Sequence, residues 1–115
     1  MMKTHDIMIA GGGPAGLAAG IRAAQIGLDA VVVEPKPAPI DKACGEGLMP
    51  AALASLAKLG VERPDGHTFV GIRYLDAQHP QRRATGDFDA PGLGVRRLEL
   101  HRRLSERAEA LGVQR

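Results

Sequence analysis

A short apolar run that ends in a cluster of glycines, near the start of this chain, constrains its fold most strongly. Residues 7–10 read IMIA, and their composition predicts a buried parallel strand over residues 3–10. Residues 11–16 read GGGPAG, and Pro14 is typical of the first turn of a helix. Leu17 and later apolar residues at helical spacing give that helix one apolar face. A buried strand that turns into a helix through three glycines predicts an α/β fold.

A second apolar run follows this helix and completes a predicted right-handed βαβ unit over residues 3–34. The residues from Gly11 to Gly16 match G-x-G-x-x-G, and Glu34 closes the second strand about 20 residues later, where dinucleotide-binding proteins carry an acid. The motif alone is weak, but here it follows a strand, opens a helix and has its acid. We therefore interpret it as a dinucleotide site. It does not separate FAD from NAD, because both carry an adenosine diphosphate half.

Each position of the motif has a physical role. Gly11 permits the tight turn, Gly13 has no side chain to keep a diphosphate from the backbone, and Gly16 lets the helix pack near the strand. The free N–H groups and the dipole at the helix N-terminus attract phosphate. Glu34 can accept a hydrogen bond from a ribose hydroxyl, and its charge would repel a 2′-phosphate, which disfavours NADP at this site. The cofactor-binding residues predicted in this unit are Gly11, Gly13, Pro14, Ala15, Gly16 and Glu34.

The rest of the chain alternates loops with short regular elements. The pattern predicts a proline-rich cofactor loop at 35–49, a short helix at 50–59, a β excursion at about 67–95, and a helix at 98–111. Within the excursion we expect strands at 69–75 and 81–88 and a loop at 90–94. In the last helix, arginines alternate with glutamates, which predicts a solvated face and a Glu99–Arg103 pair. Because a strand should follow that helix, we expect residues 1–115 to be the N-terminal part of a longer protein.

Composition bounds the class of protein. Apolar residues make up 44% and charged residues 24%, as in ordinary folded proteins. A net charge of +2 and an aromatic content of 3% give no sign of a nucleic-acid partner. Neither a membrane span nor a signal peptide is visible, so we expect a cytoplasmic protein without stable membrane insertion. The single Cys and the scattered histidines predict no metal site, and we expect the histidines at the surface: His5, His67, His79 and His101.

Three segments resemble one group of flavoproteins. Residues 5–19 (HDIMIAGGGPAGLAA) resemble the N-terminus of FAD-dependent monooxygenases of the p-hydroxybenzoate hydroxylase type, and are similar to geranylgeranyl reductases and flavin-dependent halogenases. Residues 41–50 (DKACGEGLMP) resemble the Cys-Gly loop common in the reductase-like branch. Arg97, Leu100 and Leu104 fit the group's Arg-x-x-Leu-x-x-x-Leu helix beside the flavin. The resemblance implies a Rossmann-like FAD/NAD(P)-binding fold, here with an incomplete parallel sheet and a β-hairpin excursion. It also implies that residues 1–115 are the N-terminal part of an FAD-binding domain whose remainder is absent.

The resemblance also implies further cofactor-binding residues. The loop after Glu34 would lie along the cofactor, with Lys36 and Lys42 offsetting phosphate charge. Arg97 would contact the phosphates or the ribityl chain, and Arg96 is the alternative for that role. For Cys44 a small residue allowing close backbone approach, a catalytic or redox role, and covalent flavin attachment all stay open. The residues added in this way are Pro35, Lys36, Cys44, Gly45 and Arg97.

The resemblance implies an FAD enzyme, most simply an NAD(P)H-dependent flavin monooxygenase acting on an organic small molecule. An FAD-dependent alkene reductase of the geranylgeranyl reductase type is the alternative, favoured by Cys44 and Gly45. An inactive partial nucleotide-binding fragment is a third possibility, because the family's later Gly-Asp motif is missing. An NAD-dependent dehydrogenase is disfavoured by the proline-rich loop. The substrate and the oligomeric state are not predicted.

Overall fold

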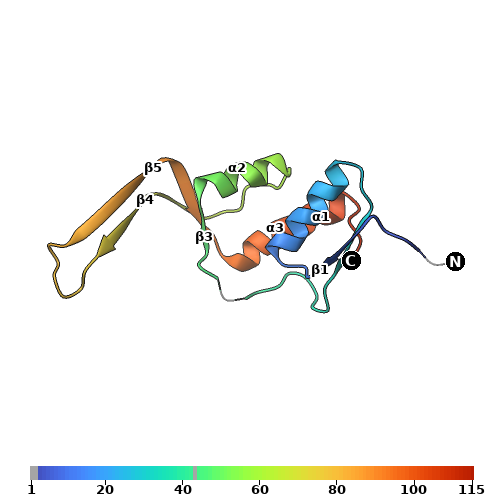
Figure 1. Ribbon diagram of the computed structural model, residues 1–115, viewed down its shortest axis with the longest axis horizontal. Coiled ribbons are helices and arrows are strands. Elements are labelled where there is room, and N and C mark those ends of the chain that lie inside the picture. Colours follow the sequence, from blue (N-terminus) through green and yellow to red (C-terminus); the bar gives the residue numbers. More distant parts are fainter. Residues whose placement is uncertain (1–2, 43) are drawn as a thin grey trace.

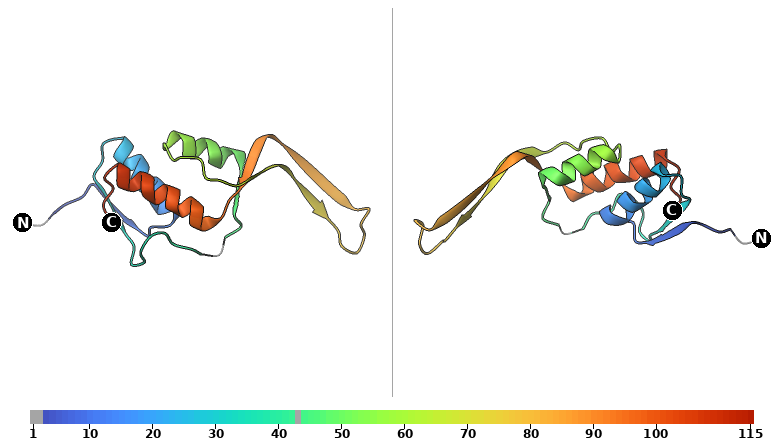
Figure 2. Two further views of the ribbon diagram at one scale, coloured as in Figure 1. Left: turned by 180° about the vertical axis from the view of Figure 1, so that it is seen from behind. Right: turned by 45° about the horizontal axis from the view of Figure 1, so that its top comes forward.

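The computed structural model describes residues 3–42 and 44–115, so Met1, Met2 and Ala43 of the predicted cofactor loop lie outside the described residues. Two small sheets and three helices form an elongated molecule of 69 × 27 × 21 Å, in which a long hairpin projects away from the helices (Figure 1). Figure 2 shows the same projecting hairpin from two further directions. Within the described residues, no helix is long and apolar enough to cross a membrane.

The predicted βαβ unit is confirmed. Strand β1 (Ile7–Ala10), helix α1 (Pro14–Gln25) and strand β2 (Ala30–Val33) follow in order, and the two strands pair in parallel. β1 begins at Ile7 and not at residue 3. Gln114, just beyond the last helix, forms a parallel bridge with Val31 on the other edge of β2. The chain after the last helix therefore lies parallel to β2, where the sequence predicts a strand.

The two faces of the parallel sheet differ in burial. Ile9 and Val32 are register partners and face α1, and Val32 is fully buried. The alternate residues Met8 and Val33 are 73% and 51% exposed. The prediction that the first strand is buried is wrong for this face, because among the described residues no helix or strand packs on it.

The β excursion forms an antiparallel sheet with the order β3-β5-β4, from strands β3 (Gly47–Leu48), β4 (His67–Leu75) and β5 (Arg83–Gly94). The loop predicted at 90–94 is wrong, because β5 continues to its end and pairs there with both neighbours. Pro91, which cannot donate to a ladder, lies where the pairing of β4 with β5 is shifted between Phe69 and Gly71. The strand is therefore irregular just before Gly92 and regularly paired from Gly92 to its end.

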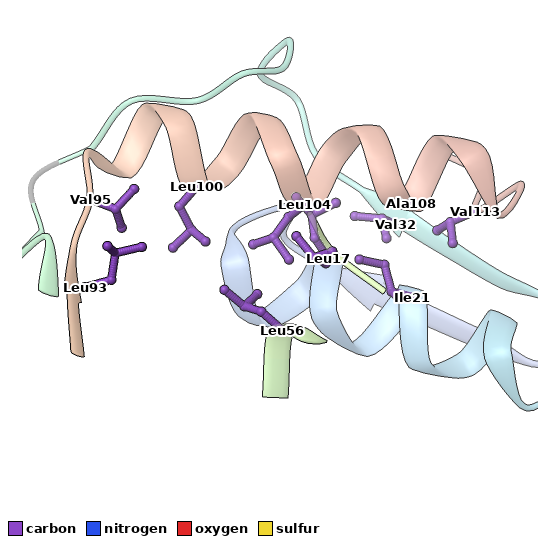
Figure 3. Packing of buried hydrophobic residues seen from close by; sticks show 11 residues of the cluster. Leu17, Ile21, Val32, Leu56, Leu93, Val95, Leu100, Leu104, Ala108 and Val113 are labelled. Atoms are coloured by element: carbon purple, nitrogen blue, oxygen red, sulfur yellow. The ribbon is translucent and has the colours of Figure 1, made fainter. Parts of the chain in front are cut away.

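Helices α2 (Pro50–Lys58) and α3 (Arg97–Ala110) lie within a residue of their predicted bounds. Leu17 and Ile21 of α1 pack with Leu104 of α3 and with Val32 of β2 in one buried cluster, as Figure 3 shows. Each such fully buried side chain contributes roughly 1.5–3 kcal/mol relative to exposure. This packing ties α3 to α1, and so fixes the start of α3 relative to the glycines that precede α1.

Candidate dinucleotide-binding site

The glycine bend, residues 11–13, has the shape that the motif predicts. Gly11 has φ +108°, a conformation that other residues rarely adopt, and a Cβ there would meet nothing within 4 Å. A Cβ at Gly16 would instead collide with the carbonyl oxygen of Gly11. A Cβ at Gly13 would contact only the Arg97 Nη2 atom, at 3.6 Å. The bend is therefore close to α1 on one side and open on the other.

The N-terminus of α1 offers unpaired donors beside this open space. Pro14 opens the helix, no side chain caps it, and the first intrahelical bond runs from Leu17 N to Gly13 O at 2.9 Å. In the described part of the chain, the N–H groups of Gly13, Ala15 and Gly16 have no hydrogen-bond acceptor. Free N–H groups at the positive end of a helix dipole bind anions.

Glu34 lies against the glycine bend, as predicted. Its Oε1 accepts a hydrogen bond from Gly12 N–H at 3.1 Å, and its Oε2 accepts one from Lys36 N–H at 3.2 Å. These two bonds, chiefly that from Gly12, hold the pKa of the carboxyl below its ordinary value. The side chain is therefore ionised and oriented, with lone pairs left for a hydroxyl donor.

Gly12 is a site residue that the sequence reasoning missed, since the motif allows any residue there. It is buried, and a Cβ would approach the Cβ of Glu34 to 2.9 Å. A larger residue would push the acid away from the bend. The available signal was that a glycine also fills the middle position of the run, which the motif leaves free.

Arg97 is the first residue of α3, and its guanidinium reaches the glycine bend at Gly13. Its Nε is buried and has no hydrogen-bond partner among the described residues. A buried donor without an acceptor destabilises a protein by about 1–3 kcal/mol, so such groups are normally paired. The Nη2 of the same guanidinium lies 3.6 Å from the position of a Cβ on Gly13, and a charged donor this close to the free amides fits a phosphate oxygen. The residues present therefore fit the diphosphate of a dinucleotide.

His101 contradicts the prediction that the histidines lie at the surface, because its side chain is fully buried. Its Nε2 donates to the carbonyl oxygen of Gly12 at 2.6 Å, and its Nδ1 accepts from Ile40 N–H at 3.1 Å. The partners assign the neutral tautomer with the proton on Nε2. The available signal was helical spacing, since His101 lies one turn after Arg97 and next to the buried Leu100.

The other arginines of α3 are engaged. Arg103 pairs with Glu99 at 2.9 Å, as predicted, and with Glu62 at 2.7 Å. Arg102 also pairs with Glu99, and Arg107 donates to a backbone carbonyl. These contacts leave Arg97 as the arginine of this helix directed at the bend.

The cofactor loop carries the remaining predicted residues, of which, among the residues that the structure describes, only Lys36 is bonded to this cluster, through its N–H to Glu34. Pro35 and Lys36 follow Glu34 directly, and both are exposed. Cys44 is exposed, and its Sγ accepts a hydrogen bond from Glu46 N–H at 3.2 Å. Gly45 is exposed as well, with open space around it. No hydrogen bond within the described residues links Cys44 or Gly45 to the glycine bend, so their predicted flavin contact stays a prediction.

A strand, a glycine bend with free amides, and an ionised acid at the end of the next strand define a dinucleotide-binding protein of the α/β class. Residues 6–100 match the family model described as FAD binding domain, and the chain belongs to that family. The expected Rossmann-like FAD/NAD(P)-binding fold and the resemblance to FAD-dependent flavoproteins are thereby confirmed.

Two relatives and one solved structure illustrate the likeness. The menaquinone reductase of Mycolicibacterium smegmatis is 52% identical over 61 residues, which cover 53% of this chain and 15% of the relative. The menaquinone reductase of Mycobacterium tuberculosis H37Rv is 35% identical over 119 residues, which cover 95% of this chain and 28% of the relative. The structure of 2-methyl-3-hydroxypyridine-5-carboxylic acid oxygenase is 30% identical in sequence, with a TM-score of 0.77. The match covers 98% of this chain and 31% of the oxygenase. The chain spans less than a third of the length of these proteins.

Proposed function

We propose that this chain holds the adenosine diphosphate half of FAD in a flavin-dependent oxidoreductase. The observation that carries the proposal is the guanidinium of Arg97, whose Nε is buried without a partner among the described residues and whose Nη2 lies 3.6 Å from the position of a Cβ on Gly13, next to the free N–H groups of the bend. A diphosphate would give an acceptor to both kinds of donor at once. Helix α1 adds its positive dipole end, so three features of this chain attract the same group.

The chemistry of each residue determines which part of the cofactor it would bind. The N–H groups of Gly13, Ala15 and Gly16, together with Arg97, would bind the phosphate oxygens, and Glu34 would accept from a ribose hydroxyl. Bound FAD supplies the electron and hydride transfer, which the protein directs by orientation. Because Glu34 stays ionised at neutral pH, a 2′-phosphate next to it would be repelled. This side chain therefore favours the unphosphorylated ribose of FAD.

For the reaction we propose reduction of a prenylated quinone, with NADH or NADPH as the reductant and the cytoplasm as the location. The two mycobacterial relatives named as menaquinone reductases support this substrate class. A prenylated quinone also contains the alkene that the reductase alternative requires. Oxygenation of an organic small molecule, the leading expectation from the sequence, is the second candidate. It is supported by the 30% identity to an oxygenase structure.

One experiment on the full-length protein separates these reactions. The protein is incubated with NADH or NADPH and menaquinone without oxygen, then exposed to air, and the quinone is analysed by mass spectrometry. Alkene reduction leaves two added hydrogens that survive air, whereas a reduced quinone ring is reoxidised. Uptake of O₂ with one oxygen atom retained in an organic product would instead support the second candidate. No flavin in the purified protein, and none bound on addition, would contradict both.

A matched pair of variants connects the activity to the site. Arg97→Gln should lose FAD and with it turnover, because the donor beside the bend is removed. Arg96→Gln is the control, since Arg96 is exposed at the adjacent position. Equal FAD content in the two variants would remove Arg97 from the proposal.

A further inference from the structure

His101 connects three segments that are far apart in the sequence. It belongs to α3, its Nε2 bonds Gly12 in the glycine bend, and its Nδ1 bonds Ile40 in the cofactor loop. Ser105 Oγ lies 3.3 Å from the same Nδ1, one turn further along the helix. The imidazole is fully buried, so its polar atoms depend on these partners.

Both peptide groups that flank the Gly12 Cα are fixed by a hydrogen bond to a side chain. Its N–H donates to Glu34 Oε1, and its carbonyl oxygen accepts from His101 Nε2. In a planar trans peptide the carbonyl oxygen and the following N–H point in opposite directions. Fixing the carbonyl of Gly12 on His101 therefore directs the N–H of Gly13 away from His101. That N–H is one of the free donors at the open side of the bend.

We propose that His101 is a positioning residue for the dinucleotide site. It orients the Gly12–Gly13 peptide so that the Gly13 N–H is presented to the diphosphate, and it ties the cofactor loop to the bend through Ile40. It acts through the backbone and does not itself contact the cofactor. The inference rests on the proposed FAD-binding function, and it concerns how the bend is preorganised for that function.

The energetics favour such a role over simple packing. The distance of 2.6 Å from Nε2 to the Gly12 oxygen is short for an N–H···O bond. Removing the imidazole would leave a buried carbonyl and a buried N–H without partners, in two segments at once. A free Gly12 carbonyl could then rotate, and the Gly13 N–H would rotate with it. The Gly13 N–H would then no longer be held in the direction of the diphosphate.

Three variants of the full-length protein isolate the bond to Gly12. His101→Gln places an amide donor near the Nε2 position, and we expect FAD affinity within about threefold of the wild type. His101→Asn places its amide near Nδ1, where it keeps an acceptor for Ile40 but does not reach Gly12. We expect His101→Asn to bind FAD roughly 10-fold or more weakly, as for loss of one buried hydrogen bond. Ser105→Ala is the control and should bind as the wild type does.

The readouts are the FAD dissociation constant of the apoprotein and the ³¹P spectrum of the bound diphosphate. We expect the ³¹P signals to shift in His101→Asn and to be restored in His101→Gln, a pattern that a general loss of packing would not produce. Thermal unfolding of each apoprotein identifies a variant that fails to fold. Equal affinity and equal ³¹P spectra in the Gln and Asn variants would overturn the role of His101. Failure of the wild-type protein to bind FAD would instead overturn the proposed function.

Discussion

Replacement of Arg97 by methionine should change stability and binding in opposite directions. In the structure the Nε of Arg97 is buried without an acceptor, so the protein without cofactor carries the cost of an unsatisfied donor, about 1–3 kcal/mol when fully buried. Methionine fills a similar volume without that donor. Because Arg97 is only half-buried, we expect the free energy of unfolding of the apoprotein to stay equal or to rise by up to about 1 kcal/mol.

Binding should fall in the same variant. A hydrogen bond to a charged group contributes about 1.5–3 kcal/mol, which corresponds to a loss of FAD affinity of roughly 10- to 150-fold. The assay removes FAD from the full-length protein, measures unfolding in urea, and titrates FAD back by fluorescence. Arg96→Met serves as the control for loss of one positive charge next to the site. A destabilised Arg97→Met protein that binds FAD as tightly as the wild type would refute the reasoning.

Three further predictions follow from the same contacts. Gly16→Ala should destabilise the protein by about 1–3 kcal/mol and release FAD, because the new Cβ collides with the Gly11 carbonyl oxygen; urea unfolding tests this, and an alanine variant of full stability would contradict it. Glu34→Ala should weaken FAD binding by roughly 1–3 kcal/mol in a fluorescence titration, and unchanged binding would remove Glu34 from the site. The pKa of Glu34 is lowered in the folded state, so its contribution to stability is complete above the ordinary carboxyl value of 4.5 and is lost as the pH falls through the lower folded value. The difference in unfolding free energy between the wild type and Glu34→Gln should be constant above that pH and shrink below it, and a difference that already shrinks near neutral pH would contradict the assignment.

Local patterns were sufficient for the parts of the fold that local physics determines. The strand–glycine–helix unit, α2 and α3 were predicted within a few residues, because apolar periodicity, Pro14 and the glycines act over one or two turns. The association of Glu34 with the bend was also predictable from its distance along the chain.

The errors have a common physical cause, since each concerns contacts between distant residues. Residues 90–94 have the composition of a loop, yet β5 continues there because both β3 and β4 pair with it. Met8 was expected inside, but burial depends on which element covers each face of the sheet. His101 was expected outside, and its partners Gly12 and Ile40 are 89 and 61 residues away. No local pattern specifies such a partner.

A crystal structure of the full-length protein with FAD is the most direct test of the central claim, that the bend, Glu34 and Arg97 together hold the adenosine diphosphate. The account predicts a ribose hydroxyl within hydrogen-bonding distance of the Glu34 carboxylate, and a diphosphate oxygen on the guanidinium of Arg97 and the N–H of Gly13. An adenosine bound elsewhere, with Arg97 still unpaired and Glu34 facing only its own backbone, would contradict it.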